Sequence, residues 1–307
     1  MKKLTAAILA LILVLSLCAC SSTKSTNTNN ETQKPETSTT KPEQSDNTPN
    51  AKTYTIADEV IVDNENCTFK IVKAEVDKLW GFKLKTYCEN KTSDKALMFS
   101  IDDVSVNGYM SDPFWAEEVA PGKKTNGDIT FPSSDFEAIG LSFADEITFT
   151  LRVYDSDDWS ADDYVKDTFT IYPTGLSAAE IVYPERRISA TEQVVVDNDD
   201  ICFIILDQKD DSFWGYTLNC YIENKTDKRL MFSWDDVSVN GFMIDPFWAK
   251  GVAPGMKCYS GISFSTSDFE ENSITEVENI EYTVRAYDSD NWLSDDIYNN
   301  TLTYLPQ

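Results

Sequence analysis

Two acidic segments hold the side chains best suited to metal binding. Residues 155–163 read DSDDWSADD, and residues 288–296 read DSDNWLSDD. Each follows a stretch of alternating apolar residues, which predicts a loop at the end of a strand. Carboxylates at this density can supply oxygen ligands to Ca²⁺, although the spacing is not that of an EF-hand. The alternative is a solvated loop; the candidate calcium ligands are Asp155, Asp157, Asp162, Asp163, Asp288, Asp290, Asp295 and Asp296.

The charge within these loops must be relieved by solvent, by a base or by a cation. The first loop is expected to extend over residues 155–167, where Lys166 is its one base, and Asn299 stands at the aligned position of the second loop. We therefore expect weak Ca²⁺ binding at best, with the larger stabilisation in the second segment.

Tryptophans recur at matched positions and are the candidate ligand-binding residues: Trp115, Trp159, Trp248 and Trp292. Exposed indole rings can stack on sugars or anchor a protein partner. The alternative is that they fill a core. A binding protein should leave several of them exposed and clustered, whereas a spacer should bury them.

Catalytic chemistry has little support in this chain. It contains no histidine, which removes the commonest general base, the Ser–His and Cys–His nucleophile pairs and histidine-ligated zinc. Nearby carboxylates carry little information among 52 acidic residues. We expect no enzyme activity and no cofactor beyond weakly bound Ca²⁺.

An internal duplication organises all of these residues. Residues 102–116 read DDVSVNGYMSDPFWA, and residues 235–249 read DDVSVNGFMIDPFWA, with thirteen of the fifteen positions identical. We call these segments the first and second copies of the shared block. The register extends in both directions, so we predict two domains, repeat one at residues 53–173 and repeat two at residues 188–307, joined by a short linker at residues 174–187.

Each repeat reads as a set of short strands. Residues 82–88 and 147–153 alternate apolar and polar side chains, as do residues 216–222 and 280–286. Further strands are expected in repeat one at residues 60–62, 68–74, 97–106, 125–131 and 168–172, with turns at Asn107-Gly108 and Pro121-Gly122. Single helical turns with a serine cap are expected near residues 134–137, 177–180 and 267–270. The strand number and spacing predict an all-β protein of two tandem immunoglobulin-like β-sandwiches.

Two features interrupt this pattern. Asp102-Asp103 and Asp235-Asp236 lie inside otherwise apolar strands, which indicates a β-bulge or an edge device. The cysteines differ between the repeats: Cys67 and Cys88 stand in repeat one, and Cys202, Cys220 and Cys258 stand in repeat two. Their strand positions hint at cross-strand pairs, but buried free thiols are the default expectation.

The N-terminus predicts a membrane-anchored lipoprotein. Residues 1–19 have a basic start and an apolar stretch typical of a signal peptide. Leu17-Cys18-Ala19-Cys20 matches a bacterial lipobox, so Cys20 is the expected lipid attachment site. Residues 20–52 are rich in Ser, Thr, Asn, Pro and Glu, which predicts a disordered tether. With a formal charge of −26, the chain would be repelled by nucleic acid.

The lipobox, the Ser/Thr/Asn-rich tether, the Glu-Asn-Lys-Thr turn, the Val-Ser-Val-Asn-Gly segment and the closing Tyr-Asp-Ser-Asp-x-Trp segment resemble the telokin-like, immunoglobulin-fold domains of uncharacterised Gram-positive surface lipoproteins. The resemblance implies a fold and an address at the outer face of the cell membrane, with no catalytic residues. We therefore expect two non-catalytic modules that bind a wall component, a glycan or a protein; the alternative is a structural spacer without a specific ligand.

Overall fold

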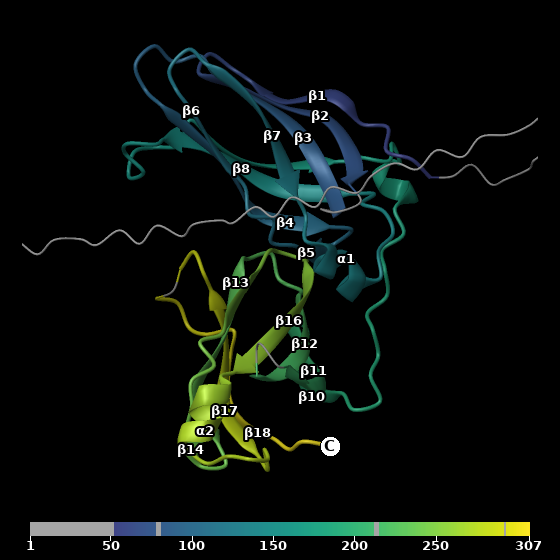
Figure 1. The fold of residues 1–307 in the computed structure, drawn as a ribbon, viewed down its shortest axis with the longest axis vertical. Helices are drawn as coiled ribbons and strands as arrows, with labels where there is room; N and C mark the ends of the chain where they lie inside the picture. Colours follow the sequence, from purple (N-terminus) through teal and green to yellow (C-terminus); the bar gives the residue numbers. More distant parts are fainter. Residues whose placement is uncertain (1–51, 78–80, 212–214, 292) are drawn as a thin grey trace, which may run out of the picture. The chain divides into compact units, whose positions relative to one another are not determined.

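The computed structural model describes residues 52–77, 81–211, 215–291 and 293–307. Residues Asn50–Gln307 form one compact unit, whose secondary structure is mostly β (Figure 1). No helix within the described ranges is long and apolar enough to cross a membrane. The predicted signal peptide, Cys20 and nearly all of the predicted tether lie outside the described residues.

Repeat one is a β-sandwich-like pair of sheet layers. One layer has the strand order β1-β2-β3-β7, with bounds β1 Ala57–Asp63, β2 Cys67–Asp77, β3 Gly81–Asn90 and β7 Lys124–Thr130. The other is built on β4, which pairs with β5, β6 and β8, while β8 pairs with β9. These strands are β4 Leu97–Val106, β5 Tyr109–Met110, β6 Ala116–Val119, β8 Ile147–Asp155 and β9 Val165–Ile171.

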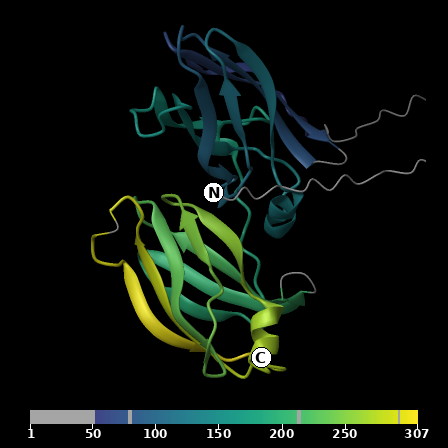
Figure 2. The ribbon, with the colours of Figure 1, turned by 60° about the vertical axis from the view of Figure 1, so that its left-hand side comes forward.

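Repeat two repeats this arrangement (Figure 2). One layer has the order β10-β11-β12-β16, with bounds β10 Gln193–Asp197, β11 Ile201–Asp211, β12 Gly215–Asn224 and β16 Lys257–Phe264. The other has the order β14-β13-β17-β18, with β15 beside β13; its bounds are β13 Leu230–Val239, β14 Phe242–Met243, β15 Ala249–Val252, β17 Ile280–Asp288 and β18 Tyr298–Tyr304.

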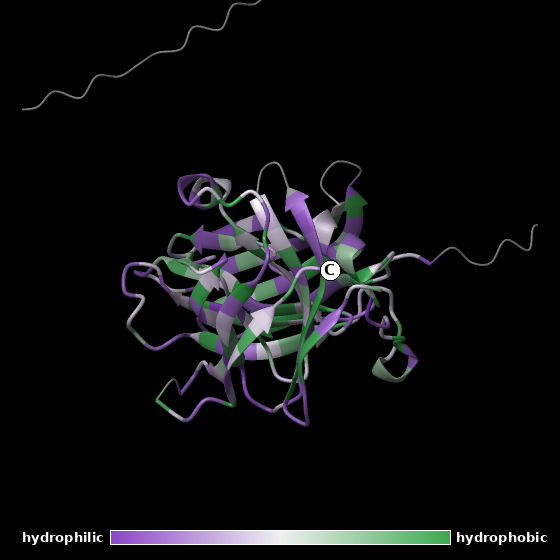
Figure 3. Cartoon of the chain, turned by 90° about the horizontal axis from the view of Figure 1, so that it is seen from below, coloured by the Kyte–Doolittle hydropathy of each residue, from purple (hydrophilic) through white to green (hydrophobic). Residues whose placement is uncertain are grey.

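Alternation along the strands explains where each core lies. In β3 the odd and even positions alternate between half-buried and buried, and β8 shows the same pattern. The buried side chains of both layers of repeat one meet in one cluster that includes Phe69, Phe99 and Phe149. Figure 3 shows the alternation as successive hydrophilic and hydrophobic bands along the strands. Burial of one face of each layer therefore holds each sandwich together.

The all-β prediction is confirmed, and most strands lie where the alternation placed them. β4 spans the predicted residues 97–106. The two short strands β5 and β6 were not predicted, because strands of two and four residues are too short to show a period. Helix α1 (Ser133–Ile139) begins after Pro132 without a side-chain cap, whereas helix α2 (Thr266–Glu271) begins at Ser265, whose hydroxyl accepts the Ser267 N–H.

The paired aspartates form bulges, as one of the two sequence readings predicted. The register of β4 against β8 shifts between Asp102 and Ser105, and Asp103 has φ of 49°. The register of β13 against β17 shifts in the same way after Asp235, and Asp236 has φ of 50°. A bulge leaves extra residues out of the ladder, so these carboxylates leave the core without breaking the strand.

A buried asparagine fixes the Glu-Asn-Lys-Thr turn of each repeat. Asn90 Nδ2 donates to the carbonyl oxygens of Lys95 and Val119, at 2.8 and 2.7 Å, and Asn90 Oδ1 accepts the Thr92 N–H. Asn224 makes the corresponding bonds to Lys228, Val252 and Thr226. Both side chains are fully buried, so the recurrence of this turn in the sequence has a structural cause.

The chain enters and leaves repeat one at the same place. The backbone N–H groups of Thr55 and Ile56 both donate to the Pro173 carbonyl, at 2.8 and 3.1 Å. Asp145 joins the same two ends, because one of its oxygens accepts from Lys52 Nζ and the other from Thr174 Oγ1. We call this group of contacts the end clamp.

All five described cysteines are free and buried. Cys67 and Cys88 belong to the core of repeat one. Cys220 and Cys258 belong to the core of repeat two, whereas Cys202 lies in a separate cluster on the outer side of the same layer. The hinted pairing of Cys202 with Cys220 fails because the two thiols face opposite sides of the sheet.

Candidate ligand-binding cleft

The first copy of the shared block carries a hairpin that docks on repeat two. The turn Asn107-Gly108 leads from β4 into β5, and β5 pairs in parallel with β16 through Tyr109 and Lys257. The Lys257 N–H donates to the Gly108 carbonyl at 3.0 Å. This contact joins strands of both repeats into one nine-stranded sheet.

Tyr109 is the centre of this contact. Its ring stacks on Tyr259 with centroids 5.6 Å apart, and its hydroxyl donates to the Pro184 carbonyl at 3.1 Å. Around it, one apolar cluster combines Ile139 of α1 with side chains of β11 and β12; these are Cys202, Ile204, Leu206 and Tyr221. We call this apolar outer surface of β11, β12 and β16 the acceptor face.

Two ion pairs flank the docked hairpin, and both use acids of the shared block. Arg229 Nε donates to Asp103 Oδ1 at 2.7 Å. The Lys250 ammonium donates to the Asp112 carboxylate. The bulge at Asp103 thus presents its carboxylate to a cation from repeat two. Steric fit and charge together fix which surfaces of the two repeats meet.

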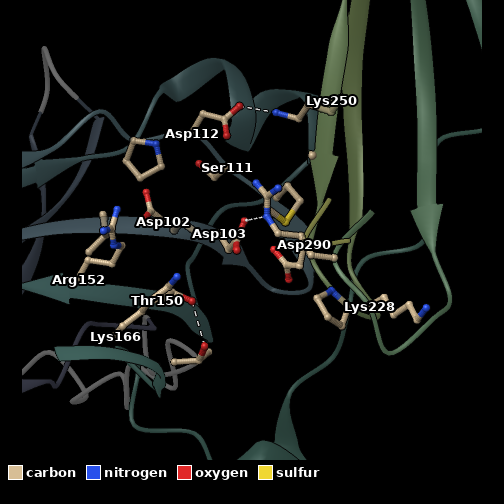
Figure 4. Close-up of a pocket in the computed structure, with 18 of the residues that line it drawn as sticks. Asp102, Asp103, Ser111, Asp112, Thr150, Arg152, Lys166, Lys228, Lys250 and Asp290 are labelled. Atoms are coloured by element: carbon tan, nitrogen blue, oxygen red, sulfur yellow. Dashed lines mark hydrogen bonds and ion pairs between the residues drawn. The ribbon is translucent and has the colours of Figure 1, made fainter. Parts of the chain in front are cut away.

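A cleft of about 1050 Å³ opens beside this junction (Figure 4). Repeat one contributes the bulge, the 110–114 segment and the outward side chains of β8 and β9. Repeat two contributes strand β15 and its loops around residues 228 and 290. The charged lining residues are Arg152, Lys166, Lys228, Arg229, Lys250, Asp102, Asp103, Asp112, Asp227, Asp288 and Asp290. Five bases and six acids here contrast with 26 and 52 in the whole chain, so the cleft is far less acidic than the protein around it.

Several charged groups of the cleft are held by partners. Arg152 donates two hydrogen bonds to Asp163, each 3.0 Å long, which raise the pKa of the guanidinium. Burial opposes ionisation of Asp288, but the Asp290 N–H and the Lys228 ammonium outweigh it and hold the pKa of Asp288 below its usual value. Arg152 and Asp288 are therefore held in place by protein partners and form the rigid part of the cleft lining.

Other groups remain available to a ligand. Neither Lys166 nor Asp102 makes a side-chain hydrogen bond or ion pair with any described residue, and Asp102 interacts with Arg152 only through its charge. Phe114, on the lip of the cleft, is fully exposed. An ammonium, a carboxylate and an aromatic ring therefore border one cavity, and this set can bind hydroxyl groups and stack on a sugar ring.

The candidate calcium ligands are distributed among protein partners. Asp155 accepts from Lys95 at 2.5 Å and from the Asp157 N–H, which hold the pKa of Asp155 below its usual value. Asp163 pairs with Arg152, and Asp296 pairs with Arg285 in two bonds of 2.9 Å. Asp157, Asp162, Asp290 and Asp295 are exposed. Within the described residues no three such groups gather closely enough to hold a metal ion.

Lys166 does not by itself decide how the charge of these loops is neutralised. Bases outside the acidic segments neutralise the loops, namely Lys95 and Arg152 in repeat one and Lys228 and Arg285 in repeat two. Repeat two is therefore no poorer in cations than repeat one at this site, and the expected difference between them in Ca²⁺ response loses its basis.

The three candidate tryptophans that the structure describes do not share a surface. Trp115 is 7 % exposed and packs on Phe69 in the core, so it is a core residue. Trp248 is half-buried against the core of repeat two and donates to Ser260 Oγ at 3.0 Å. Trp159 is 79 % exposed in its loop. Trp292 lies outside the described residues.

The docking contact was missed by the sequence reading, although a signal for it exists. Residues 201–206 read ICFIIL, an unbroken apolar run, whereas the aligned residues 67–72 read CTFKIV. An unbroken apolar strand is buried on both faces. The acceptor face could have been found from this difference between the repeats.

Comparisons with known proteins bear on the fold alone. No protein-family model and no curated protein matches this chain. Among solved structures, it is similar to the Salmonella enterica SafA pilin in complex with the SafB chaperone, at a TM-score of 0.23 and 8% identity, over 80% of this chain and 98% of that one. This is a distant likeness between β-rich folds.

Proposed function

We propose that this protein is an extracytoplasmic lipoprotein, attached to the outer face of the cell membrane through Cys20, whose two immunoglobulin-like repeats together bind a cell-wall glycan. The lipobox and the polar tether support the address. A diacylated cysteine would anchor the chain stably. The function is binding, not catalysis.

The observation that carries the binding proposal is the cleft beside the junction. Lys166 and Asp102 face it without partners among the described residues, and Phe114 offers an exposed ring at its lip. Sugars are recognised by such combinations of charged hydrogen-bonding groups and an aromatic face. The ion pairs between Arg229 and Asp103 and between Lys250 and Asp112 support a preformed shape, because they hold both walls in place.

Calorimetric titration of the 50–307 chain with soluble peptidoglycan and teichoic acid fragments tests this proposal. Phe114→Ala combined with Lys166→Ala should weaken binding by about tenfold or more, equivalent to at least about 1.4 kcal/mol. The matched control is Phe247→Ala with Asn299→Ala, which changes the aligned positions of repeat two. Absence of binding to every wall fragment, or an equal loss in the control, would count against the cleft; binding only to a protein would replace the glycan as ligand.

A second candidate is a structural spacer. The burial of Trp115 and the partial burial of Trp248 favour it, since a spacer has no need of exposed indoles. The docked hairpin supports it too, because a fixed junction presents a rigid body rather than two loosely linked domains. The two functions differ in the titration: a glycan-binding protein should bind wall fragments as the wild type and lose binding in the cleft variant, whereas a spacer should bind none in either form.

A further inference from the structure

We infer that the second copy of the shared block is a docking surface for another β-sandwich domain. The first copy shows what such a surface binds, because repeat two already occupies it. Its partner in that contact supplies an apolar outer sheet face, a free strand edge and two basic side chains, those of Arg229 and Lys250. The second copy would take a partner of the same chemistry.

Aligned side chains have opposite environments in the two copies. Tyr109 is 1 % exposed under repeat two, whereas its counterpart Phe242 is 46 % exposed. Met110 is 8 % exposed and packs into the core cluster of repeat two, whereas Met243 is 72 % exposed. The bulge acid Asp236 is exposed where Asp103 is bound to Arg229. Closely similar side chains are therefore covered in one copy and uncovered in the other.

The uncovered surface is shaped as well as apolar. A hollow of about 360 Å³ lies between Asp236, Met243 and Asp245. These are the counterparts of Asp103, Met110 and Asp112, two of which bind the Arg229 and Lys250 side chains in the first copy. The hollow thus lies where the first copy receives two cations, and basic side chains of a partner would complement its acids.

A second copy of this chain does not supply the required face. In repeat one, the positions of Ile204 and Tyr259 are held by Lys70 and Asn126, which are polar. The positions of Arg229 and Lys250 are held by Ala96 and Glu117, so the two cations are replaced by a neutral residue and an acid. The acceptor face of repeat two is already filled by its own repeat one. The occupant is therefore a separate domain that resembles repeat two in these features.

The surface can be tested with the chain itself as the probe. The probe is the 50–307 chain carrying Asp103→Arg, Tyr109→Ala, Asp236→Arg and Phe242→Ala, in which the acceptor face is released and both copies of the block are disabled. Tyr109 belongs to the junction cluster and not to the core of repeat one, so its loss should leave each sandwich folded. Ile139→Lys, placed at the same junction, can replace Tyr109→Ala if the probe proves unfolded by circular dichroism.

Sedimentation velocity of the probe mixed with the wild-type chain should show a heterodimer whose population rises with concentration. In the matched control, the wild-type chain is replaced by a variant that carries only Asp236→Arg and Phe242→Ala, and the probe should form no heterodimer with it. A folded probe that leaves the wild-type chain monomeric overturns the proposal. Equal association with the matched partner also overturns it, because the released face would then be binding without regard to the second copy of the block.

Discussion

The pair Tyr109 and Phe242 allows one aromatic position to be compared in two environments within a single chain. Tyr109 is almost fully buried, stacks on Tyr259 and bonds the Pro184 carbonyl. Phe242 has the same place in the second copy of the block and is 46 % exposed. Truncation of each to alanine should therefore have very different costs.

The structure gives the size of that difference. Replacing a buried aromatic residue by alanine costs about 3–5 kcal/mol, which includes the cavity left behind. Phe242→Ala leaves no closed cavity and loses only about half of a transfer free energy of roughly 2–3 kcal/mol, or about 1 kcal/mol. We expect Tyr109→Ala to lower the free energy of unfolding by about 3 kcal/mol more than Phe242→Ala does. If each kcal/mol shifts the Tm by about 2–4 °C, the Tm of Tyr109→Ala should be roughly 6–12 °C below that of Phe242→Ala.

Differential scanning calorimetry of the 50–307 chain and its two variants at low protein concentration measures both costs. Urea unfolding followed by tryptophan fluorescence gives an independent value of the free energy. Equal Tm shifts for the two variants, or a shift for Tyr109→Ala no larger than that of a surface substitution, would refute the docked position of the hairpin.

Three further outcomes follow from groups described above. Asn90→Ala should cost about 3 kcal/mol, because two buried carbonyls lose their donor, whereas Asn126→Ala on the surface should change urea stability by less than about 0.5 kcal/mol; similar losses would contradict the role of the buried amide. Burial raises the pKa of Cys67 and Cys202 to about 11 and that of Cys258 to about 12. All described thiols should therefore resist iodoacetamide until urea unfolds the chain, as followed by mass spectrometry, and rapid labelling of the native protein would disprove their burial. Because these pKa values are higher in the folded than in the unfolded chain, the stability that the protonated thiols contribute is present below about pH 9 and is lost as the pH rises through the folded values. The hydrogen bonds from Arg285 lower the pKa of Asp296, so Arg285→Gln should lower the Tm most above the ordinary carboxyl pKa and progressively less in acid, where the wild type loses the same interaction; a Tm difference that does not change with pH would assign the effect to packing alone.

The sequence predicted the strands well because their cause is local. Alternation along residues 82–88 and 147–153 gives the faces of β3 and β8 directly, and the Asn-Gly turn gives the end of β4. The paired aspartates indicated either a bulge or an edge device, and the register shift at Asp103 shows that the bulge is the one the structure has.

The site was harder to predict because it depends on contacts between distant segments. Arg229 meets Asp103 across 126 positions of the chain, and nothing near either residue records that contact. Trp115 illustrates the same limit in reverse, since a recurrent tryptophan can signal a ligand surface or a core, and only its packing on Phe69 decides between them. The neutralisation of Asp155 by Lys95, which lies in the turn before β4 and 60 positions away in the chain, could not be deduced from the loop alone.

The end clamp also determines how this protein would respond to mechanical load. If force is applied to the chain before Lys52 while repeat two is held, the tension enters repeat one at Thr55 and leaves it at Pro173. These residues are bonded to each other, so tension would pass from one to the other without being transmitted through the sheets of repeat one. The two backbone bonds and the contacts of Asp145 with Lys52 and Thr174 would open first. The sheets of repeat one would thus carry no tension until the end clamp breaks, so the clamp would be the first part of this repeat to unfold under force.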